Sequence, residues 1–204
     1  MTTSHLSVVS VDVLALHYDG DTGTLRVAVP RRDRDPYAGC RALPGVVVTS
    51  GERLEAAARR ALAKFTYSRP AVIGQLRTFD EPSRDPRGPS LSIAMFAVLD
   101  HLDDAVAADI AAPPNDLGFD HTHIIDSCRP LLASHMLTDR EFTRSLLPNQ
   151  FTSVDARNIQ TALTGVVPHM GNLNRALDDA GATKSEDRVT TGRGRPAVLR
   201  SFSD

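Results

Sequence analysis

The feature of this sequence that most constrains its fold is a change of pattern late in the chain. Up to about residue 99, short apolar runs are separated by polar turns, and the first run alternates Val9, Val11 and Val13 with Ser10 and Asp12. Such alternation predicts a half-buried strand, because successive side chains of a strand point to opposite faces. From about residue 150, two helix-length segments that each end at a glycine precede a polar hairpin pattern. We therefore expect a strand-rich domain followed by a smaller domain with a different architecture.

The first part of the chain mixes strand and helix patterns. Residues 51–65 carry apolar side chains at helical spacing, which predicts an amphipathic helix. A loop dense in proline, glycine and charge occupies residues 80–89. Strands and helices interspersed in this way indicate an α/β or α+β domain. The strands are expected at residues 6–18, 25–30, 43–48, 72–79 and 91–99.

The middle of the chain is expected to be helical after a link at residues 103–117. A helix should start near Asp120, and Pro130 should kink or interrupt it because proline removes a backbone donor. Thr138 and Glu141 have the spacing of a capping box, which predicts a further short helix ending before Pro148.

The last part of the chain has the order of a winged helix-turn-helix. Thr152 and its neighbours offer helix caps, and Gly165 is the expected stop of that helix. A second helix is expected at residues 169–180, followed by a hairpin whose tip is residues 191–196. Helix, turn, helix and hairpin is the arrangement of winged DNA-binding domains. We predict a first domain at residues 1–136 and a winged helix-turn-helix domain at residues 137–204.

Composition permits a globular protein and leaves DNA binding open. The chain has 204 residues, 41% of them hydrophobic, and a formal net charge of -2, so a DNA-binding surface would have to be a local basic patch. Cys40 and Cys128 match no metal or redox spacing, and we expect free thiols. No apolar run approaches a membrane span, so we expect a soluble, cytoplasmic protein with no membrane contact.

The segment from Gly45 to Glu52 and the helix after it resemble the Nudix box. That family places several carboxylates on one helix face, where they hold Mg²⁺ that binds pyrophosphate and activates water. Here Ala61, Lys64 and Phe65 stand at the acidic positions of the box. The resemblance therefore implies a Nudix-like domain that is not an enzyme, with no catalytic residue, metal ion or cofactor.

Further motifs resemble the Nudix-related transcriptional regulators of NAD metabolism, the NrtR family. The resemblance extends over nearly the whole chain, and the motifs occur in the family's order. It implies a Nudix-like sensor fused to a winged helix, and a homodimer. It also implies an ADP-ribose-like effector that changes the affinity of the protein for operator DNA. The motifs are Arg34-Asp35-Pro36-Tyr37-Ala38-Gly39, Gln75-Leu76-Arg77-Thr78-Phe79, Pro82-Ser83-Arg84-Asp85-Pro86-Arg87-Gly88, Phe119-Asp120-His121, Leu146-Leu147-Pro148-Asn149-Gln150-Phe151-Thr152 and Gly194-Arg195-Pro196-Ala197.

The candidate effector-binding residues are mostly cationic. Arg77, Arg84 and Arg87 could clamp a diphosphate, since guanidinium groups match phosphate oxygens. The alternative is a solvated charged loop without a ligand. Lys64 would repel a metal ion or stand in for one against a phosphate. The complete set of effector-binding candidates is Arg41, Glu52, Arg60, Lys64, Arg77, Arg84 and Arg87.

The candidate DNA-binding residues lie on the second helix and the hairpin tip of the last domain. Asparagine can read adenine and arginine can read guanine in the major groove, and arginines of a wing can enter a minor groove. The helix is poor in cations, and Asp178 and Asp179 would face phosphate badly if they lay at the DNA backbone. The candidates are Asn172, Asn174, Arg175, Arg193 and Arg195.

Three functional hypotheses follow from these patterns. The first is a homodimeric regulator, in particular a repressor of NAD-metabolism genes, whose inactive Nudix domain senses ADP-ribose or a similar nucleotide. The second is a pyrophosphohydrolase of the ADP-ribose or NADH class, with Glu52, Glu55 and an acid from a loop forming a rearranged metal site. The third is a module that neither binds DNA nor hydrolyses a nucleotide and acts through protein contacts.

Overall fold

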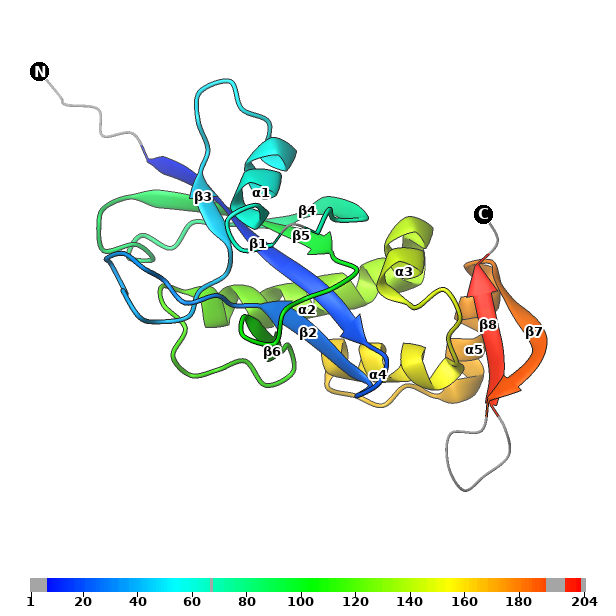
Figure 1. The fold of residues 1–204 in the computed structure, drawn as a ribbon. Coiled ribbons are helices and arrows are strands. Elements are labelled where there is room, and N and C mark those ends of the chain that lie inside the picture. The colour runs from blue at the N-terminus through cyan, green and yellow to red at the C-terminus, as the bar shows by residue number, and fades with distance from the viewer. Residues whose placement is uncertain (1–6, 67, 190–196, 203–204) are drawn as a thin grey trace, which may run out of the picture.

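The computed structural model describes residues 7–66, 68–189 and 197–202, and it is elongated, with a mixed sheet towards one end and a small hairpin at the other (Figure 1). Arg193 and Arg195 lie outside the described residues. Within the described part of the chain, no helix is long and apolar enough to cross a membrane. The elements of the sheet are β1 (Val8–Asp19), β2 (Thr24–Ala28), β3 (Gly45–Val47), β4 (Val72–Phe79), β5 (Ser90–Val98) and β6 (Ala107–Asp109).

The long strand β1 is the centre of the sheet. The strand order is β4-β5-β1-β2-β6, and β3 pairs with the first half of β1. β1 runs parallel to β5 and antiparallel to β2 and β3. The predicted strands are present, and β6 is an additional strand inside the segment expected to be a link.

Each face of the sheet is covered by a helix. On one face, Val11, Val13 and Ala15 pack with the buried alanines of α1 (Leu54–Leu62). On the other face, Leu14 and Leu16 pack in a core that includes α2 (His121–Thr138). The alternation along β1 therefore places successive side chains in two separate apolar layers.

The helices after the sheet begin at well-defined caps. Pro130 lies inside α2, which continues past it to Thr138. α3 (Arg140–Leu146) begins at Asp139, whose side chain accepts a hydrogen bond from the Phe142 amide. The expected capping box of Thr138 and Glu141 is thus replaced by a cap one residue later.

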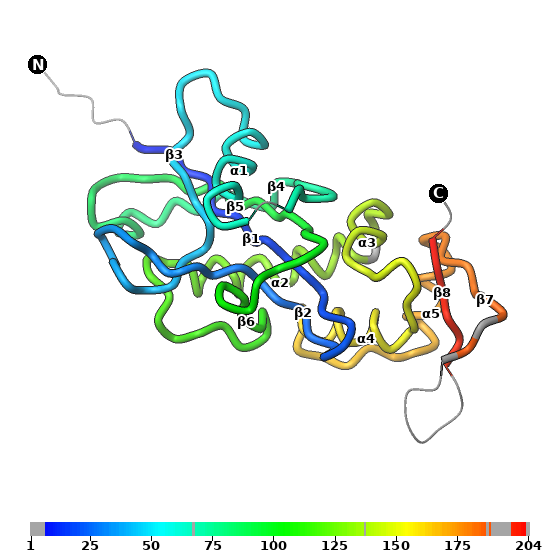
Figure 2. The backbone as a smooth tube through the Cα atoms, viewed as in Figure 1, coloured from blue at the N-terminus to red at the C-terminus, as the bar shows by residue number. Residues whose placement is uncertain are grey.

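The last part of the chain contains the expected order of two helices and a hairpin. Thr152 and Asp155 form a capping box at α4 (Ser153–Thr164), and Gly165 ends that helix in the left-handed region at φ 74°. α5 (Met170–Asp179), β7 (Ala182–Val189) and β8 (Ala197–Phe202) follow. Figure 2 shows that α5 and the hairpin lie at the far end of the molecule from the loops around α1.

The apolar core does not stop at the predicted domain boundary. One cluster of buried side chains extends from Leu14 on β1 through Phe142 on α3 to Leu173 and Leu177 on α5. The boundary between residues 136 and 137 falls in the last turn of α2. The division at this point remains a prediction, and the packing joins the two sides of it.

A polar contact also joins the sheet to α4. Tyr18, near the end of β1, is 6% exposed, and its hydroxyl donates to Oδ1 of Asp155 at 2.9 Å. Burial and the neighbouring carboxylate of Asp155 both raise the pKa of Tyr18 far above its usual value. The other oxygen of Asp155 accepts from the Thr152 amide and hydroxyl. One carboxylate therefore both caps α4 and fastens it to the sheet.

Replacement of Tyr18 by phenylalanine should lower the free energy of unfolding by about 1.5–3 kcal/mol, the range for a hydrogen bond to a charged group. Urea denaturation followed by circular dichroism measures this change. Thr164→Ala is the control, because its exposed hydroxyl bonds only at the end of α4, and it should change stability by less than about 0.5 kcal/mol. Equal stability of Tyr18→Phe and the wild type would contradict the proposed attachment.

Candidate nucleotide and DNA sites

Several loops meet at the end of the molecule that carries α1 (Figure 1). The loop after β2 is joined to the loop before α2 by backbone hydrogen bonds from the Arg41 amide to the Asp116 carbonyl and from the Gly118 amide to the Arg41 carbonyl. The Arg31 guanidinium adds bonds to the Gly39 carbonyl and to Asp116. These contacts hold the two loops as one surface, and the 80–89 loop contributes Arg84 and Arg87 to the same region.

A buried cluster of charges anchors this surface to the sheet. Arg84 is 7% exposed, and its Nε and Nη2 donate to the two oxygens of Asp120 at 3.0 and 2.7 Å. Its Nη2 also lies 3.5 Å from Oδ2 of Asp12 on β1. Ser92 on β5 donates to the same oxygen of Asp12 at 2.5 Å. The guanidinium is therefore committed to protein carboxylates.

This placement changes the role expected for Arg84. The sequence indicated a phosphate contact, but burial and two carboxylate partners leave the guanidinium a structural tie between the 80–89 loop, β1 and the start of α2. A buried arginine is stable only with such partners, since an unpaired charge in the interior is very costly.

His121, at the start of α2, completes the buried cluster. Its Nδ1 accepts a hydrogen bond from the Leu43 amide at 2.9 Å, and its Nε2 faces Oδ1 of Asp12 at 3.6 Å. Burial lowers the pKa of His121, although the charges of Asp12 and Asp120 oppose this effect. The ring is thus held in a neutral form that joins the segment before β3 to β1.

Glu52 and Arg60 form a close pair beside α1. Arg60 donates to both carboxylate oxygens of Glu52 at 2.9 and 2.7 Å, and to the Val47 carbonyl at 2.8 Å. The bond from Arg60, with bonds from the amide and hydroxyl of Thr49, lowers the pKa of Glu52 to about 2. Both residues are therefore largely occupied with each other and with the backbone.

Lys64 lies one turn beyond Arg60. Its Nζ is 3.4 Å from the carbonyl oxygen of Gly45, the first residue of β3. Gly45 has no room for a side chain, because a Cβ would collide with Oδ1 of Asp12. Lys64 and the buried charge cluster therefore lie on either side of one glycine.

The residues around Lys64 do not suit a divalent cation. Ala61 is buried and Phe65 is partly buried against the core, and neither offers an oxygen ligand. Glu52 is held by Arg60, and the Lys64 ammonium would repel a metal ion at close range. Among the described residues, no group of three or more His, Cys, Asp or Glu side chains is arranged to hold a metal ion.

The other predicted effector-binding residues are spread around the loop end. Arg41 lies 4.0 Å from Asp116. The exposed Arg77 places its guanidinium 5.1 Å from the centre of the Phe79 ring. Arg87 pairs with Asp85 and also lies 5.7 Å from the centre of the Phe119 ring. Their role as ligand contacts remains a prediction.

The sequence did not single out Tyr37, Phe119 or Arg32 as site residues, although all three meet at this end. The rings of Tyr37 and Phe119 are 4.8 Å apart, and Arg32 lies 4.7 Å from the centre of the Phe119 ring. Both aromatic residues have positive φ, which a side chain seldom adopts. The family-like motifs around Tyr37 and Phe119 were the only signal in the sequence.

At the other end of the molecule, the DNA-binding candidates on α5 divide into two groups. Asn172 and Arg175 are exposed. Asn174 instead accepts hydrogen bonds at its Oδ1 from the Ser153 hydroxyl at 2.6 Å and from Arg200 at 3.2 Å. Its side-chain oxygen is therefore used inside the protein rather than offered to a base, which differs from the sequence-based expectation.

Arg200 on β8 holds α5 and the hairpin together. It is 2% exposed and donates to Ser153, Asn174 and Asp178, the last at 2.5 Å. Lys184 on β7 also contacts Asp178 at 3.3 Å. Asp178 is thus neutralised by the hairpin, which removes much of the repulsion of DNA that the sequence indicated.

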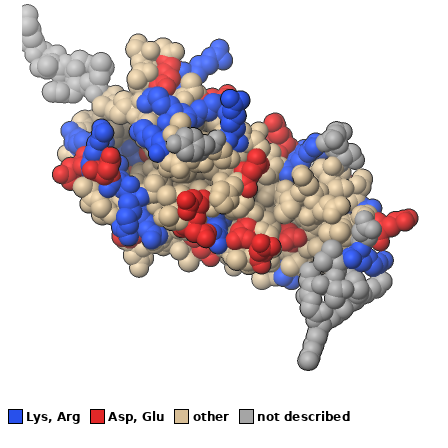
Figure 3. Space-filling model, viewed as in Figure 1, with Lys and Arg blue, Asp and Glu red and all other residues tan. Residues whose placement is uncertain are grey.

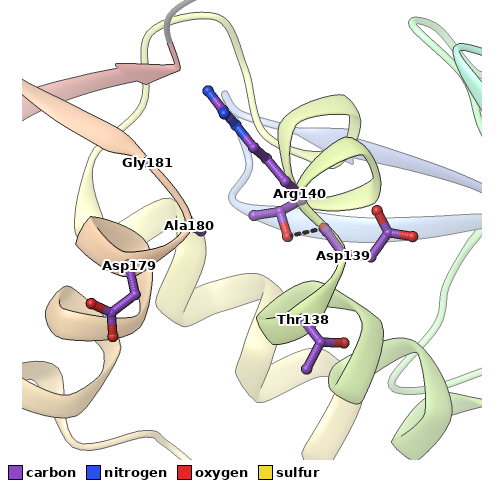
Figure 4. Close-up of a pocket in the computed structure, with 7 residues that line it drawn as sticks. Thr138, Asp139, Arg140, Asp179, Ala180 and Gly181 are labelled. Carbon is purple, nitrogen blue, oxygen red and sulfur yellow. Dashed lines mark hydrogen bonds between the residues drawn. The ribbon is translucent and has the colours of Figure 1, made fainter.

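Two hollows lie away from the predicted residues. One of about 260 Å³ is bounded by Thr138, Asp139 and Arg140 at the α2–α3 junction and by Asp179 and Gly181 at the end of α5 (Figure 4). A groove of about 600 Å³ lies between β2, β6 and α4, and Arg129 and Arg157 are among its lining residues. Both hollows are at the junction between the two parts of the chain.

Comparisons with known proteins extend over both parts of the molecule. No family model matches the chain. The crystal structure of Shewanella oneidensis NrtR complexed with a 27mer DNA matches with a TM-score of 0.75 and 26% identity, covering 96% of this chain and 93% of that one. The chain is therefore similar to a Nudix-related regulator over almost its whole length. The expected Nudix-like α/β fold and the expected resemblance are both confirmed.

Two curated proteins are also similar to this chain. An ADPR responsive transcriptional repressor of Acinetobacter baylyi is 25% identical over 195 residues, covering 90% of this chain and 78% of its own length. An ADP-ribose pyrophosphatase of Methanocaldococcus jannaschii is 36% identical over 109 residues, covering 49% of this chain. The chain spans 63% of the length of the latter protein. The Nudix domain of Shewanella NrtR, solved with ADP ribose, matches 63% of this chain with a TM-score of 0.52 and 28% identity.

Replacement of Arg84 by methionine should lower the free energy of unfolding by about 3–5 kcal/mol, because Asp12 and Asp120 would lose their buried partner. Arg87→Met in the same loop is the matched control. Its side chain is 58% exposed, and loss of its pair with Asp85 should cost less than about 1 kcal/mol. Urea denaturation of both variants measures the contrast, and similar losses would contradict the structural role of Arg84.

Proposed function

We propose that this protein is a homodimeric, DNA-binding regulator, in particular a repressor of NAD-metabolism genes, which responds to ADP-ribose or a similar nucleotide. The observation that carries the proposal is the match to Shewanella NrtR in complex with DNA, because it covers the sensor part and the helix–hairpin part together. The related Acinetobacter repressor also aligns over most of the chain. We assign residues 1–136 to the sensor and residues 137–204 to a winged helix-turn-helix.

The nucleotide is expected at the loop end of the sensor. Figure 3 shows Lys and Arg side chains gathered over this end, where a diphosphate would be attracted. Lys64 offers an exposed positive charge near the Gly45 carbonyl, and it stands at one of the positions where the Nudix box has a metal-binding carboxylate. Binding of the effector therefore requires no metal ion, and the missing carboxylates at Ala61, Lys64 and Phe65 leave it intact.

The DNA is expected at the opposite end, along α5 and the hairpin. Asn172 and Arg175 are the exposed α5 side chains that could read bases. Arg193 and Arg195 belong to the segment between β7 and β8, outside the described residues, and we expect them to contact a minor groove or phosphates. Two copies of this unit in a homodimer would read an operator with two half-sites.

A gel-shift series on the promoter of the protein's own gene tests the proposal. We expect a specific shift that weakens with salt and that changes when ADP-ribose is added, equally in EDTA and in Mg²⁺. ADP-ribose is compared with AMP and ribose 5-phosphate to define the effector. A protein that binds no DNA from that region in either state would contradict the proposal.

Charge reversal at the hairpin tip should weaken operator binding. Arg193→Glu and Arg195→Glu place negative charge near phosphates, and we expect at least about a tenfold loss of affinity at low salt. Arg34→Glu is the control, because this exposed arginine lies in the sensor loop and should leave DNA affinity unchanged. Fluorescence anisotropy with a labelled operator measures all three variants, and unchanged affinity of the tip variants would remove the wing assignment.

The identity to an ADP-ribose pyrophosphatase favours hydrolysis as a second candidate function. A rearranged metal site would have to use Glu52 and Glu55, although Arg60 and Arg59 already pair with them. Release of AMP from ADP-ribose that requires Mg²⁺ and disappears in Glu52→Gln would support this candidate. Turnover at the level of a protein-free control would exclude it.

A further inference from the structure

Two aromatic residues at the loop end are held in an unfavourable backbone conformation. Tyr37 has φ 65° and Phe119 has φ 58°, and both values lie in the left-handed region that normally suits glycine. The residues belong to different loops, yet their rings are in contact at 4.8 Å with an angle of 59° between them. Strained residues of this kind persist where the surroundings fix them, and they concentrate at ligand-binding sites.

The Phe119 ring is surrounded by side chains from neighbouring segments. The guanidinium groups of Arg32 and Arg87 lie 4.7 and 5.7 Å from the centre of its ring. The ring of His121 lies 5.3 Å away and connects Phe119 to the buried charge cluster. Two loops and the start of α2 therefore supply side chains that pack around one ring.

Tyr37 packs against the Phe119 ring but remains 41% exposed. Arg32 fixes its loop by donating to the carbonyls of Pro36 at 2.9 Å and Arg34 at 3.3 Å. Gly118 leaves room for it, since a Cβ there would be 2.9 Å from the Cβ of Tyr37. An aromatic ring is thus presented to solvent in a strained conformation, and its exposure means that core packing gains little from it.

We propose that the Tyr37 ring is the stacking platform for the adenine ring of the nucleotide effector, an inference that rests on the proposed sensor function. Adenine is a planar ring that stacks on exposed aromatic side chains. The neighbouring Arg32 and Arg87 guanidinium groups give the platform a positive potential that suits a base attached to a diphosphate. Phe119, Gly118 and Arg32 position the platform and do not contact the base.

Fluorescence gives a direct test, because the chain has no tryptophan. Tyr37→Trp introduces a single indole. AMP and ADP-ribose should quench its emission, and the quenching should saturate as the nucleotide concentration rises. Ribose 5-phosphate lacks a base and should leave the emission unchanged. N-acetyltryptophanamide measures collisional quenching at the same concentrations. If the nucleotides quench the Tyr37→Trp variant no more than they quench N-acetyltryptophanamide, the proposed stacking role of Tyr37 is wrong.

Tyr37→Gly separates ligand binding from a structural role. Glycine accepts positive φ without strain, so the variant should unfold at the same or a higher urea concentration than the wild type. Its affinity for ADP-ribose, measured by calorimetry, should nevertheless fall about 5- to 150-fold, the equivalent of one lost base stack. Tyr37→Phe keeps the ring and should retain the wild-type affinity.

The outcomes distinguish this inference from the proposed function. Wild-type affinity in Tyr37→Gly, or lower stability together with unchanged affinity, would overturn the platform while leaving the regulator intact. Quenching by AMP with no effect of any nucleotide on operator binding would keep the platform and overturn the sensor function. Failure of both AMP and ADP-ribose to bind the wild type would overturn both.

Discussion

The ion cluster of Arg84, Asp12 and Asp120 is the interaction on which the loop end of the molecule depends. It joins the 80–89 loop, the central strand and the start of α2 through side chains that are almost entirely buried. His121 extends the cluster to the Leu43 amide. Asp12 also packs closely against Gly45, whose carbonyl oxygen is near Lys64. The loops can present exposed side chains because their buried ends are fixed by charge.

The same strand connects this cluster to the other part of the chain. Asp12, Leu14, Leu16 and Tyr18 lie on one face of β1, with a polar contact at each end and apolar packing between them. β1 is hydrogen-bonded on both sides, to β5 on one side and to β2 and β3 on the other. One continuous strand therefore holds the buried charge cluster near one end and the contact of Tyr18 with Asp155 near the other.

Patterns that depend on period or on caps were predictable from the sequence, and roles that depend on tertiary partners were not. Alternation located β1, and Gly165 and Thr152 marked the ends of α4 correctly. Arg84 and Asn174 looked available because a sequence does not reveal the carboxylates and guanidinium that three-dimensional packing brings to them. The platform of Tyr37 and Phe119 escaped for a related reason, since positive φ at an aromatic residue has no compositional mark.

Arg200 has a consequence for how DNA binding can be controlled. A single buried side chain joins Ser153, α5 and β8, so the helix and the hairpin proposed to contact DNA are held together as one unit. In the proposed homodimer, an effector would act on the separation and tilt of two such units relative to the helical repeat of the operator.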